Sequence, residues 1–290
     1  MTRAEVLVSA GAVLGEGPLW DARTGDIIWV DIDAALVLRT NLAAQDLRSW
    51  PCEETVGSLG LTAAGGLVGA TPTGLRKLNV SGAPFVATFP ESDDRLRSND
   101  GKAAPDGRFV VGTMSRGAPV TGAGSLWSFG GDTAVRLVKG TTISNGLAWS
   151  ADGATLYFID TPTQEVVAYE YDTTDGTICE PRTVVRIDKA FGAPDGMCID
   201  AEGGLWVALW GGGVVHRYLE GQLDAVINVP TPLVTCPAFV GDRLDLLVIT
   251  TASVGAEGEE REGAGDLYVA DPGVKGAPVP MLGSWAERWV

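Results

Sequence analysis

The sequence of 290 residues contains a single histidine, His216. A zinc site built from two or three histidines is therefore excluded. A Ser-His-Asp hydrolase triad would have to use this one residue, so the position of His216 in the fold decides whether that mechanism is open.

Cysteine is also scarce. The four cysteines, at positions 52, 179, 198 and 236, show no C-x-x-C spacing of the kind found in metal and redox sites. A chain of this length can bury a sizeable core without a framework of disulfides. We therefore expect free thiols and a reducing, cytoplasmic location.

Positive charge is in short supply, because 21 Lys and Arg residues face 37 Asp and Glu residues and leave a net charge of −16. Such a field repels nucleic acid and anionic membrane surfaces, so neither is an expected partner. The acidity needs no explanation beyond solubility. A monomer and a small homo-oligomer both remain open.

No stretch has helical periodicity, and no apolar run is long enough to span a bilayer. The apolar stretch from Val6 to Leu14 is a weak candidate for a signal peptide, with only Arg3 before it and Glu16 shortly after it. Because Glu16 belongs to the repeat described next, we expect this stretch to be part of the mature protein.

The sequence is rich in short apolar runs separated by turn glycines. In residues 143–157, Asn145 opens one apolar run, an Asp-Gly turn ends at Gly153, and a second run follows. This pattern predicts a strand, a tight turn and a strand. The distance of 8 from Asn145 to Gly153 recurs in three other pairs of a polar residue and a glycine, at 58/66, 99/107 and 195/203. Glu16 lies 9 residues before Gly25, and a degenerate copy begins at Thr235.

The polar residues that open these six copies, at positions 16, 58, 99, 145, 195 and 235, are 42, 41, 46, 50 and 40 residues apart. A repeat of roughly 40–50 residues made of short strands is typical of a propeller blade. The sequence therefore predicts an all-β, six-bladed β-propeller that forms one domain over residues 1–290. A strand over residues 3–10 is expected to join the last blade beside Leu267 to Ala270 and to close the ring.

Four of the repeat positions carry a carboxylate or an amide side chain, and we call them the hub residues: Glu16, Asn99, Asn145 and Asp195. Their shared register should place them at one height around the axis, converging on the central channel. Taken singly, each could be a turn residue, since Asn or Asp before Gly is common in turns. Together they favour a metal site, because carboxylate and amide oxygens suit a divalent cation. Asp100, Asp152 and Gly196 are interpreted as turn residues.

The same register places His216 at an outer position of the fifth blade, among valines. A structural role is expected there, which argues against a triad. Two insertions, residues 115–123 and 252–264, follow inner strands and are either lids over one mouth of the channel or solvated loops.

Several of these segments resemble the regucalcin/gluconolactonase (senescence marker protein) family over nearly the whole chain. The matching motifs are LGEGPLW at 14–20, RSNDGK at 97–102, GTM at 112–114, SNGLAWS at 144–150, PDG at 194–196 and LWGG at 209–212. The resemblance implies a six-bladed propeller with one divalent cation in its channel, and an enzyme that hydrolyses sugar lactones. One departure is that Ser115, Arg116 and Gly117 follow the GTM motif, where some members carry acidic residues that touch the substrate.

The resemblance also implies roles for individual residues. Glu16, Asn145 and Asp195 match the protein ligands of the metal, and Asp195 also matches the proposed general base. Arg97 and Asn99 match residues that contact the substrate. The native ion is left open among calcium, magnesium, manganese, zinc and ferrous iron. Trp210 and Met114 could wall the site or simply pack within their blades.

These residues fit the expected chemistry. A divalent cation polarises a lactone carbonyl and stabilises negative charge on oxygen. Two alternatives remain at this point: a hydrolase acting on phosphotriesters or other esters, and a propeller that binds calcium without catalysis, since the fold alone implies no activity.

Overall fold

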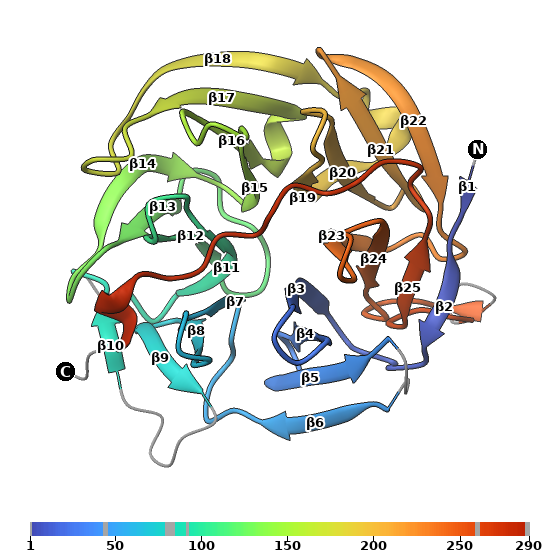
Figure 1. The fold of residues 1–290 in the computed structure, drawn as a ribbon, viewed down its shortest axis with the longest axis horizontal. Coiled ribbons are helices and arrows are strands. Elements are labelled where there is room, and N and C mark those ends of the chain that lie inside the picture. The colour runs from blue at the N-terminus through green and yellow to red at the C-terminus, as the bar shows by residue number, and fades with distance from the viewer. Residues whose placement is uncertain (1, 43–45, 79–84, 91–92, 259–261, 288–290) are drawn as a thin grey trace.

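Six small sheets surround a central axis in the structure (Figure 1). It is a computed structural model that describes residues 2–42, 46–78, 85–90, 93–258 and 262–287. Within these ranges there is no α-helix, only short 3-10 turns: η1 (Thr161–Thr163), η2 (Lys189–Phe191) and η4 (Ser284–Glu287). The predicted all-β, six-bladed β-propeller is confirmed.

Each of the first three blades is an antiparallel sheet whose strands follow one another in sequence, with the first strand of the blade nearest the axis. Blade one contains β3 (Gly15–Asp21), β4 (Asp26–Asp31), β5 (Leu36–Asn41) and β6 (Arg48–Pro51). Blade two contains β7 (Ser58–Leu61), β8 (Leu67–Thr71), β9 (Gly74–Leu78) and β10 (Phe85–Thr88). Blade three contains β11 (Leu96–Ala103), β12 (Phe109–Ser115), β13 (Gly124–Phe129) and β14 (Val135–Thr141).

The remaining blades repeat this order. Blade four contains β15 (Ser144–Trp149), β16 (Thr155–Asp160), β17 (Glu165–Tyr171) and β18 (Ile178–Arg186). Blade five contains β19 (Ala193–Ile199), β20 (Leu205–Trp210), β21 (Val214–Leu219) and β22 (Gln222–Asn228). Blade six contains β23 (Val234–Val240), β24 (Leu246–Thr251) and β25 (Leu267–Ala270).

The N-terminal segment completes two blades. Strand β2 (Glu5–Val8) pairs antiparallel with β25, with Val6 opposite Tyr268, as predicted for the closing strand. Strand β1 (Thr2–Arg3) instead pairs parallel with β22 and extends blade five. The single strand expected over residues 3–10 is therefore wrong in its extent: the chain changes blades at the buried Ala4, whose N–H still bonds to the carbonyl of Asn228.

The apolar core is divided among the blade interfaces. Six clusters of buried side chains occur, one between each pair of neighbouring blades. Strand β4 shows how the sequence produces this arrangement, because successive side chains of a strand point to opposite faces. Ile28 and Val30 pack toward blade two, whereas Ile27 and Trp29 pack toward blade six.

The segment of residues 271–283, which we call the C-terminal strap, crosses one end of the channel (Figure 1). It bonds to three blades at or just after the end of the first strand: the carbonyl of Lys275 accepts from Ala201 N, Leu282 N donates to Leu61 O, and Gly283 N donates to Gly107 O. The hub residues lie at the starts of first strands, so the strap covers the opposite end.

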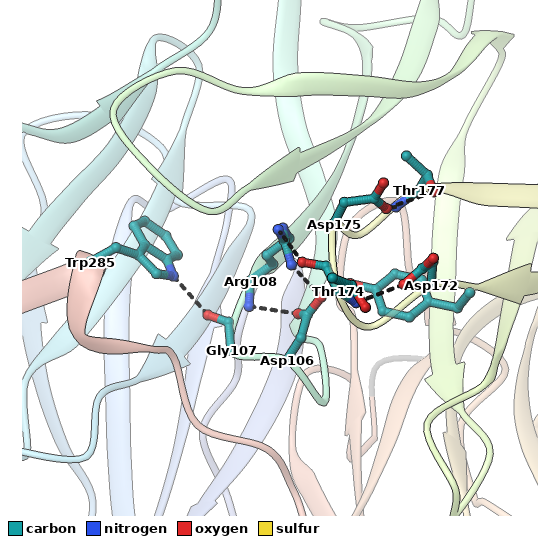
Figure 2. A network of polar contacts seen from close by, with 9 residues as sticks. Asp106, Gly107, Arg108, Asp172, Thr174, Asp175, Thr177 and Trp285 are labelled. Atoms are coloured by element: carbon teal, nitrogen blue, oxygen red, sulfur yellow. Dashed lines mark hydrogen bonds and ion pairs between the residues drawn. The ribbon is translucent and has the colours of Figure 1, made fainter.

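Beyond the strap, Trp285 fastens the chain to blade three. Its indole Nε1 donates to Gly107 O at 2.8 Å, and the neighbouring Asp106 holds Arg108 in an ion pair (Figure 2). Tyr171 of blade four donates to the same Asp106 carboxylate, also at 2.8 Å. This network joins the end of the described chain to two adjacent blades.

The cysteines match the expectation of free thiols: Cys198 and Cys236 are buried, Cys52 is half-buried and Cys179 is exposed. Over the described ranges, no helix is both long and apolar enough to cross a membrane.

Candidate metal centre in the channel

The first strands of the blades depart from regular pairing where the hub residues lie. Across residues 99–100, 145–146 and 195–196, two residues face a single residue of the second strand. In blade one the same irregularity falls across residues 17–18, directly after Glu16. A bulge of this kind re-aims a side chain that would otherwise alternate between the two sheet faces. It lets side chains from four blades turn toward one another.

The Asn-Gly and Asp-Gly pairs in these bulges are strand residues, so the interpretation of Asp100 and Gly196 as turn residues is wrong. A Cβ on Gly196 would lie 2.5 Å from Cys236 Sγ, and one on Gly146 would lie 2.6 Å from the carbonyl oxygen of Asp195. Glycine is needed because neighbouring first strands approach closely at the axis. Asp152 does occupy its predicted turn, where it accepts a bond from Ser150 Oγ at 2.6 Å.

Hydrogen bonds connect the hub residues across blades. Asn99 Nδ2 donates to Asn145 Oδ1 at 3.2 Å and to the carbonyl of Ser144 at 3.0 Å. Asn145 Nδ2 donates to Thr161 Oγ1 at 2.9 Å, and Thr161 Oγ1 donates to Pro194 O, next to Asp195, at 2.8 Å. The amides are thereby held between blades three, four and five.

Arg97 fixes the direction of this chain. Its Nη1 donates to Asn99 Oδ1 at 2.6 Å and to Ser98 O at 2.9 Å. Because a guanidinium can only donate, the Asn99 oxygen must face Arg97 and the Asn99 nitrogen must face Asn145. Arg97 therefore orients the Asn145 oxygen through one intermediate amide.

The two hub carboxyl groups lie in an environment that opposes their charge. The four hub residues are between 4% and 7% exposed. Burial is the main cause that raises the pKa of Glu16 well above its ordinary value, and the charges of Asp195 and Asp100 add to it. Burial likewise raises the pKa of Asp195, followed by the charge of Asp100, against the lowering effects of a hydrogen bond from Asn145 and of Arg97. The positive charge of Arg97 is therefore not enough to offset the burial of these two carboxylates.

This donor set fits a divalent cation. Within the described part of the chain no three His, Cys, Asp or Glu side chains gather as a metal site, so a cation here would need an amide oxygen beside the two carboxylates. Asn145 Oδ1 can supply it, because a carbonyl oxygen has two lone pairs and Asn99 uses only one. A divalent cation would balance the two negative charges of Glu16 and Asp195, which are otherwise buried without a matching positive charge.

The other two blades contribute small hydroxyls at the equivalent positions. Ser58 begins β7, is fully buried, and its Oγ has no hydrogen-bond partner among the described residues. Thr235 in β23 donates to Gly15 O at 2.6 Å. The six predicted repeat positions therefore all fall in the first strands.

The structure also gives the positions of three other residues considered in the sequence: His216, Met114 and Trp210. His216 lies in β21, the third strand of blade five, where Nδ1 lies 3.0 Å from Tyr218 Oη and the ring packs on Phe191, so it is away from the channel as predicted. Met114 is buried opposite Arg97 in the β11–β12 pair, and Trp210 is half-buried opposite Ala193.

Hydrogen bonds of serine side chains hold parts of both insertions. Ser115 Oγ donates to Ala118 O at 3.0 Å and accepts from Val120 N at 2.9 Å, which ties loop 115–123 to its own base. In the other insertion, Ser253 Oγ donates to Ala12 O at 2.9 Å. Residues 259–261 of that insertion lie outside the described residues, and the lid role of both loops stays a prediction.

A separate cavity of about 230 Å³ lies at the strap end. Its walls include Trp149, Phe239, Pro278 and Val279, with Lys102 as the charged lining residue, and none of the hub residues lines it. This apolar cavity is therefore distinct from the candidate centre.

The sequence profile of the SMP-30/Gluconolactonase/LRE-like region matches residues 14–253, which include all four hub residues. The chain belongs to this family. A Bacillus subtilis protein named as a candidate sugar lactone lactonase, YvrE, is 37% identical over 94% of the chain and 96% of its own length. Regucalcin of Xenopus laevis is 35% identical over 97% of the chain and 99% of its own length. The crystal structure of regucalcin from Agrobacterium tumefaciens, described as a calcium-binding protein, has a TM-score of 0.89 and 27% identity, and the match covers 97% of each chain.

Sequence reasoning assigned no place near this SMP-30/gluconolactonase-type hub to three charged residues, Asp100, Lys102 and Arg116. Asp100 is 3% exposed, and Lys102, whose Nζ donates to Met197 O at 2.6 Å, lowers its pKa against the stronger effect of burial. Arg116 lies next to Arg97, where its Nε donates to Leu96 O at 3.1 Å. The RSNDGK motif contains Asp100 and Lys102, but its Asp-Gly pair resembles a turn when read alone.

Proposed function

We propose that this protein is a divalent-cation-dependent hydrolase that opens sugar lactones to aldonic acids, in the breakdown of sugars. The observation that carries the proposal is that Asp195 is hydrogen-bonded to Asn145 of the neighbouring blade and acts electrostatically on Glu16 of a third blade. Membership of the SMP-30/gluconolactonase family supports it, as does 37% identity to a relative named as a candidate sugar lactone lactonase. The net charge of −16 repels nucleic acid and anionic membranes, so the proposed partner is a small molecule.

Glu16, Asn145 and Asp195 would hold the cation. When bound, it would supply Lewis-acid polarisation of the lactone carbonyl and offset negative charge on oxygen. Calcium, magnesium, manganese, zinc and ferrous iron all suit oxygen donors, so the choice among them belongs to experiment.

The side chains of the hub then have separate tasks. Water adds to the lactone carbonyl carbon, the ring C–O bond breaks, and the ring oxygen leaves as a hydroxyl. Asp195, ionised once its charge is balanced, accepts the proton of the attacking water and returns it to the ring oxygen as the C–O bond breaks. Arg97 keeps donors free beyond those it gives to Asn99 and Ser98, and these would bind the hydroxyls of the sugar or the carboxylate that forms.

A second candidate is supported by the regucalcin relatives, one of which is described as a calcium-binding protein. In that case the hub would bind a cation without turnover. Both candidates predict cation binding, so binding alone does not separate them.

The deciding experiment is a hydrolysis screen over glucono- and pentono-lactones, with a phosphotriester as a third substrate class. The protein is stripped with a chelator and then loaded with one divalent ion at a time. We expect lactone opening that disappears on stripping and returns with at least one ion. Tight ion binding without turnover of any substrate would favour the non-catalytic candidate, and faster phosphotriester turnover would favour the other hydrolase.

A further inference from the structure

Two arginines stand beside the hub without an acidic partner. Arginines such as Arg23, Arg95 and Arg217 form ion pairs with Asp or Glu within 4.0 Å, whereas Arg97 and Arg116 form none with a described residue. An unpaired guanidinium close to a candidate site is available to a ligand.

The local structure places the two side chains together. Arg97 lies on β11 opposite Met114 of β12, and Arg116 follows two residues after Met114. Arg116 bonds through Nε to Leu96 O, the residue before Arg97, and its backbone N–H bonds to Arg95 O at 2.7 Å. A guanidinium carries five N–H donors in a rigid fork, so most donors of Arg116 are left over.

Electrostatics agree with this proximity. Burial is the first cause that lowers the pKa of Arg97, and the positive charge of Arg116 lowers it further. The nearby carboxylates of Asp33, Glu16 and Asp195 raise it. Arginine remains protonated throughout, so both side chains keep their charge at neutral pH.

Once the hub holds a divalent cation, the net charge of the groups around Arg97 and Arg116 is therefore positive. The carboxylates of Glu16 and Asp195 would balance a divalent cation. Asp33, an exposed residue in the loop after β4, adds one negative charge near Arg97. Asp100 beside the hub is offset by Lys102, so one positive charge remains in excess among these groups, in a protein whose overall field is strongly negative.

We propose that the lactone opened at this hub carries an anionic substituent outside the ring, and that Arg116 with Arg97 binds it. This inference rests on the proposed lactonase function and narrows its substrate class. A carboxylate or a phosphate would satisfy the bidentate fork of a guanidinium, whereas a neutral sugar would leave Arg116 without a partner. Arg116 is the specificity-determining residue of the pair, because Arg97 is already engaged with Asn99.

The kinetic test compares two lactones that share a five-membered ring and differ in one group: glucono-1,4-lactone, which is neutral, and glucaro-1,4-lactone, which carries a carboxylate. The ratio of their kcat/KM values should favour the charged lactone in the wild type. It should fall about 10- to 100-fold in Arg116→Gln, as expected for the loss of a charge-assisted hydrogen bond, and further in Arg116→Glu. Arg95→Gln is the matched control, because it removes the same charge from a neighbouring arginine that Asp93 already holds, and its ratio should equal that of the wild type.

A binding measurement separates this inference from the lactonase proposal. In thermal-shift titrations of the calcium-loaded protein, D-glucarate and 6-phosphogluconate are compared with D-gluconate, which lacks the second anionic group. Tighter binding of D-glucarate or 6-phosphogluconate than of D-gluconate, lost in Arg116→Gln and weakened by added salt, supports the inference even if no lactone is opened. The relative strength of these two ligands tells carboxylate from phosphate. Cation-dependent opening of glucono-lactone together with equal binding of all three acids would overturn it and leave the lactonase function standing.

Discussion

Asn99 Nδ2 lies 3.2 Å from Asn145 Oδ1, although the two residues are 46 positions apart and belong to different blades. Arg97 holds the other end of the Asn99 amide at 2.6 Å. Partners of this kind, one contact removed from a metal, set the direction and basicity of the atom that binds it. Asn99 would thus act on the cation site by positioning Asn145, in addition to its proposed contact with substrate.

Replacing Asn99 by alanine removes the bond to Asn145 Oδ1 and frees that amide to rotate. We expect calcium affinity, measured by calorimetry on the stripped protein, to fall about 10- to 100-fold. Asn228→Ala on the outer strand β22 serves as the control and should bind calcium as the wild type does. Unchanged affinity in Asn99→Ala would show that Asn145 is oriented without it.

Replacing Asp195 by asparagine keeps the shape of the side chain and removes both its charge and its basicity. We expect kcat on lactones to fall about 10²- to 10⁴-fold, the usual contribution of a general base, with the circular dichroism spectrum unchanged. Asp152→Asn, in an exposed turn far from the hub, should retain full activity. A variant at position 195 that keeps most of the rate would refute a catalytic role.

The stability of the protein should depend on pH and on cation together. Burial raises the pKa of Glu16, Asp195 and Asp100, so without a cation the ionisation of these groups opposes folding. Their favourable contribution is complete below the ordinary carboxyl pKa and is lost as pH rises through the raised values. A bound cation offsets the charge, so the gain in Tm on adding calcium should be larger at pH 8 than at pH 5.

The same melting series contains its own check. In Asp195→Asn one buried charge is gone, so the stripped variant should lose less stability than the stripped wild type as pH rises. It should also gain less from calcium. An equal calcium gain at both pH values in the wild type would mean that these carboxyls do not bind the ion.

Gly146 should tolerate no side chain. A Cβ there would lie 2.6 Å from Asp195 O and 2.8 Å from the Cβ of Met197, so the two first strands would have to separate. We expect Gly146→Ala to reduce the free energy of unfolding by about 1–3 kcal/mol, as overpacking does. Gly131→Ala, where a Cβ would meet no atom within 4 Å, should change it by less than about 0.5 kcal/mol. Urea denaturation of both variants gives the comparison, and similar values would contradict close packing at the hub.

The blade repeat was predictable because it is a local pattern: an apolar run, a turn glycine such as Gly153 and a second run. The contact between Asn99 and Asn145 agrees with the equal spacing of the copies. The bulges did not follow, because Asn145 before Gly146 has the sequence of a turn. Only the neighbouring blade, whose Asp195 carbonyl occupies the space of a Cβ, shows why glycine is there.

The contacts made by irregular segments could also not be predicted from the sequence. The C-terminal strap has no periodicity, and its bonds to Leu61 and Gly107 depend on the finished ring. The pairing of β1 with β22 involves two residues, too few to produce a pattern. Arg116 could be noticed as a departure from the family, but its position beside Arg97 required the β11–β12 register.

The passage of the N-terminal chain from blade five to blade six has a mechanical consequence. In a linear stack of repeats the outermost unit has one neighbour and can peel away first. Here every blade packs on two neighbours, and the first described residues pair with both blade five and blade six, where the ring would otherwise be open. Unfolding any one blade therefore breaks two interfaces at once. The closed ring thus resists local unfolding and keeps donors that are far apart in the sequence at a fixed mutual distance.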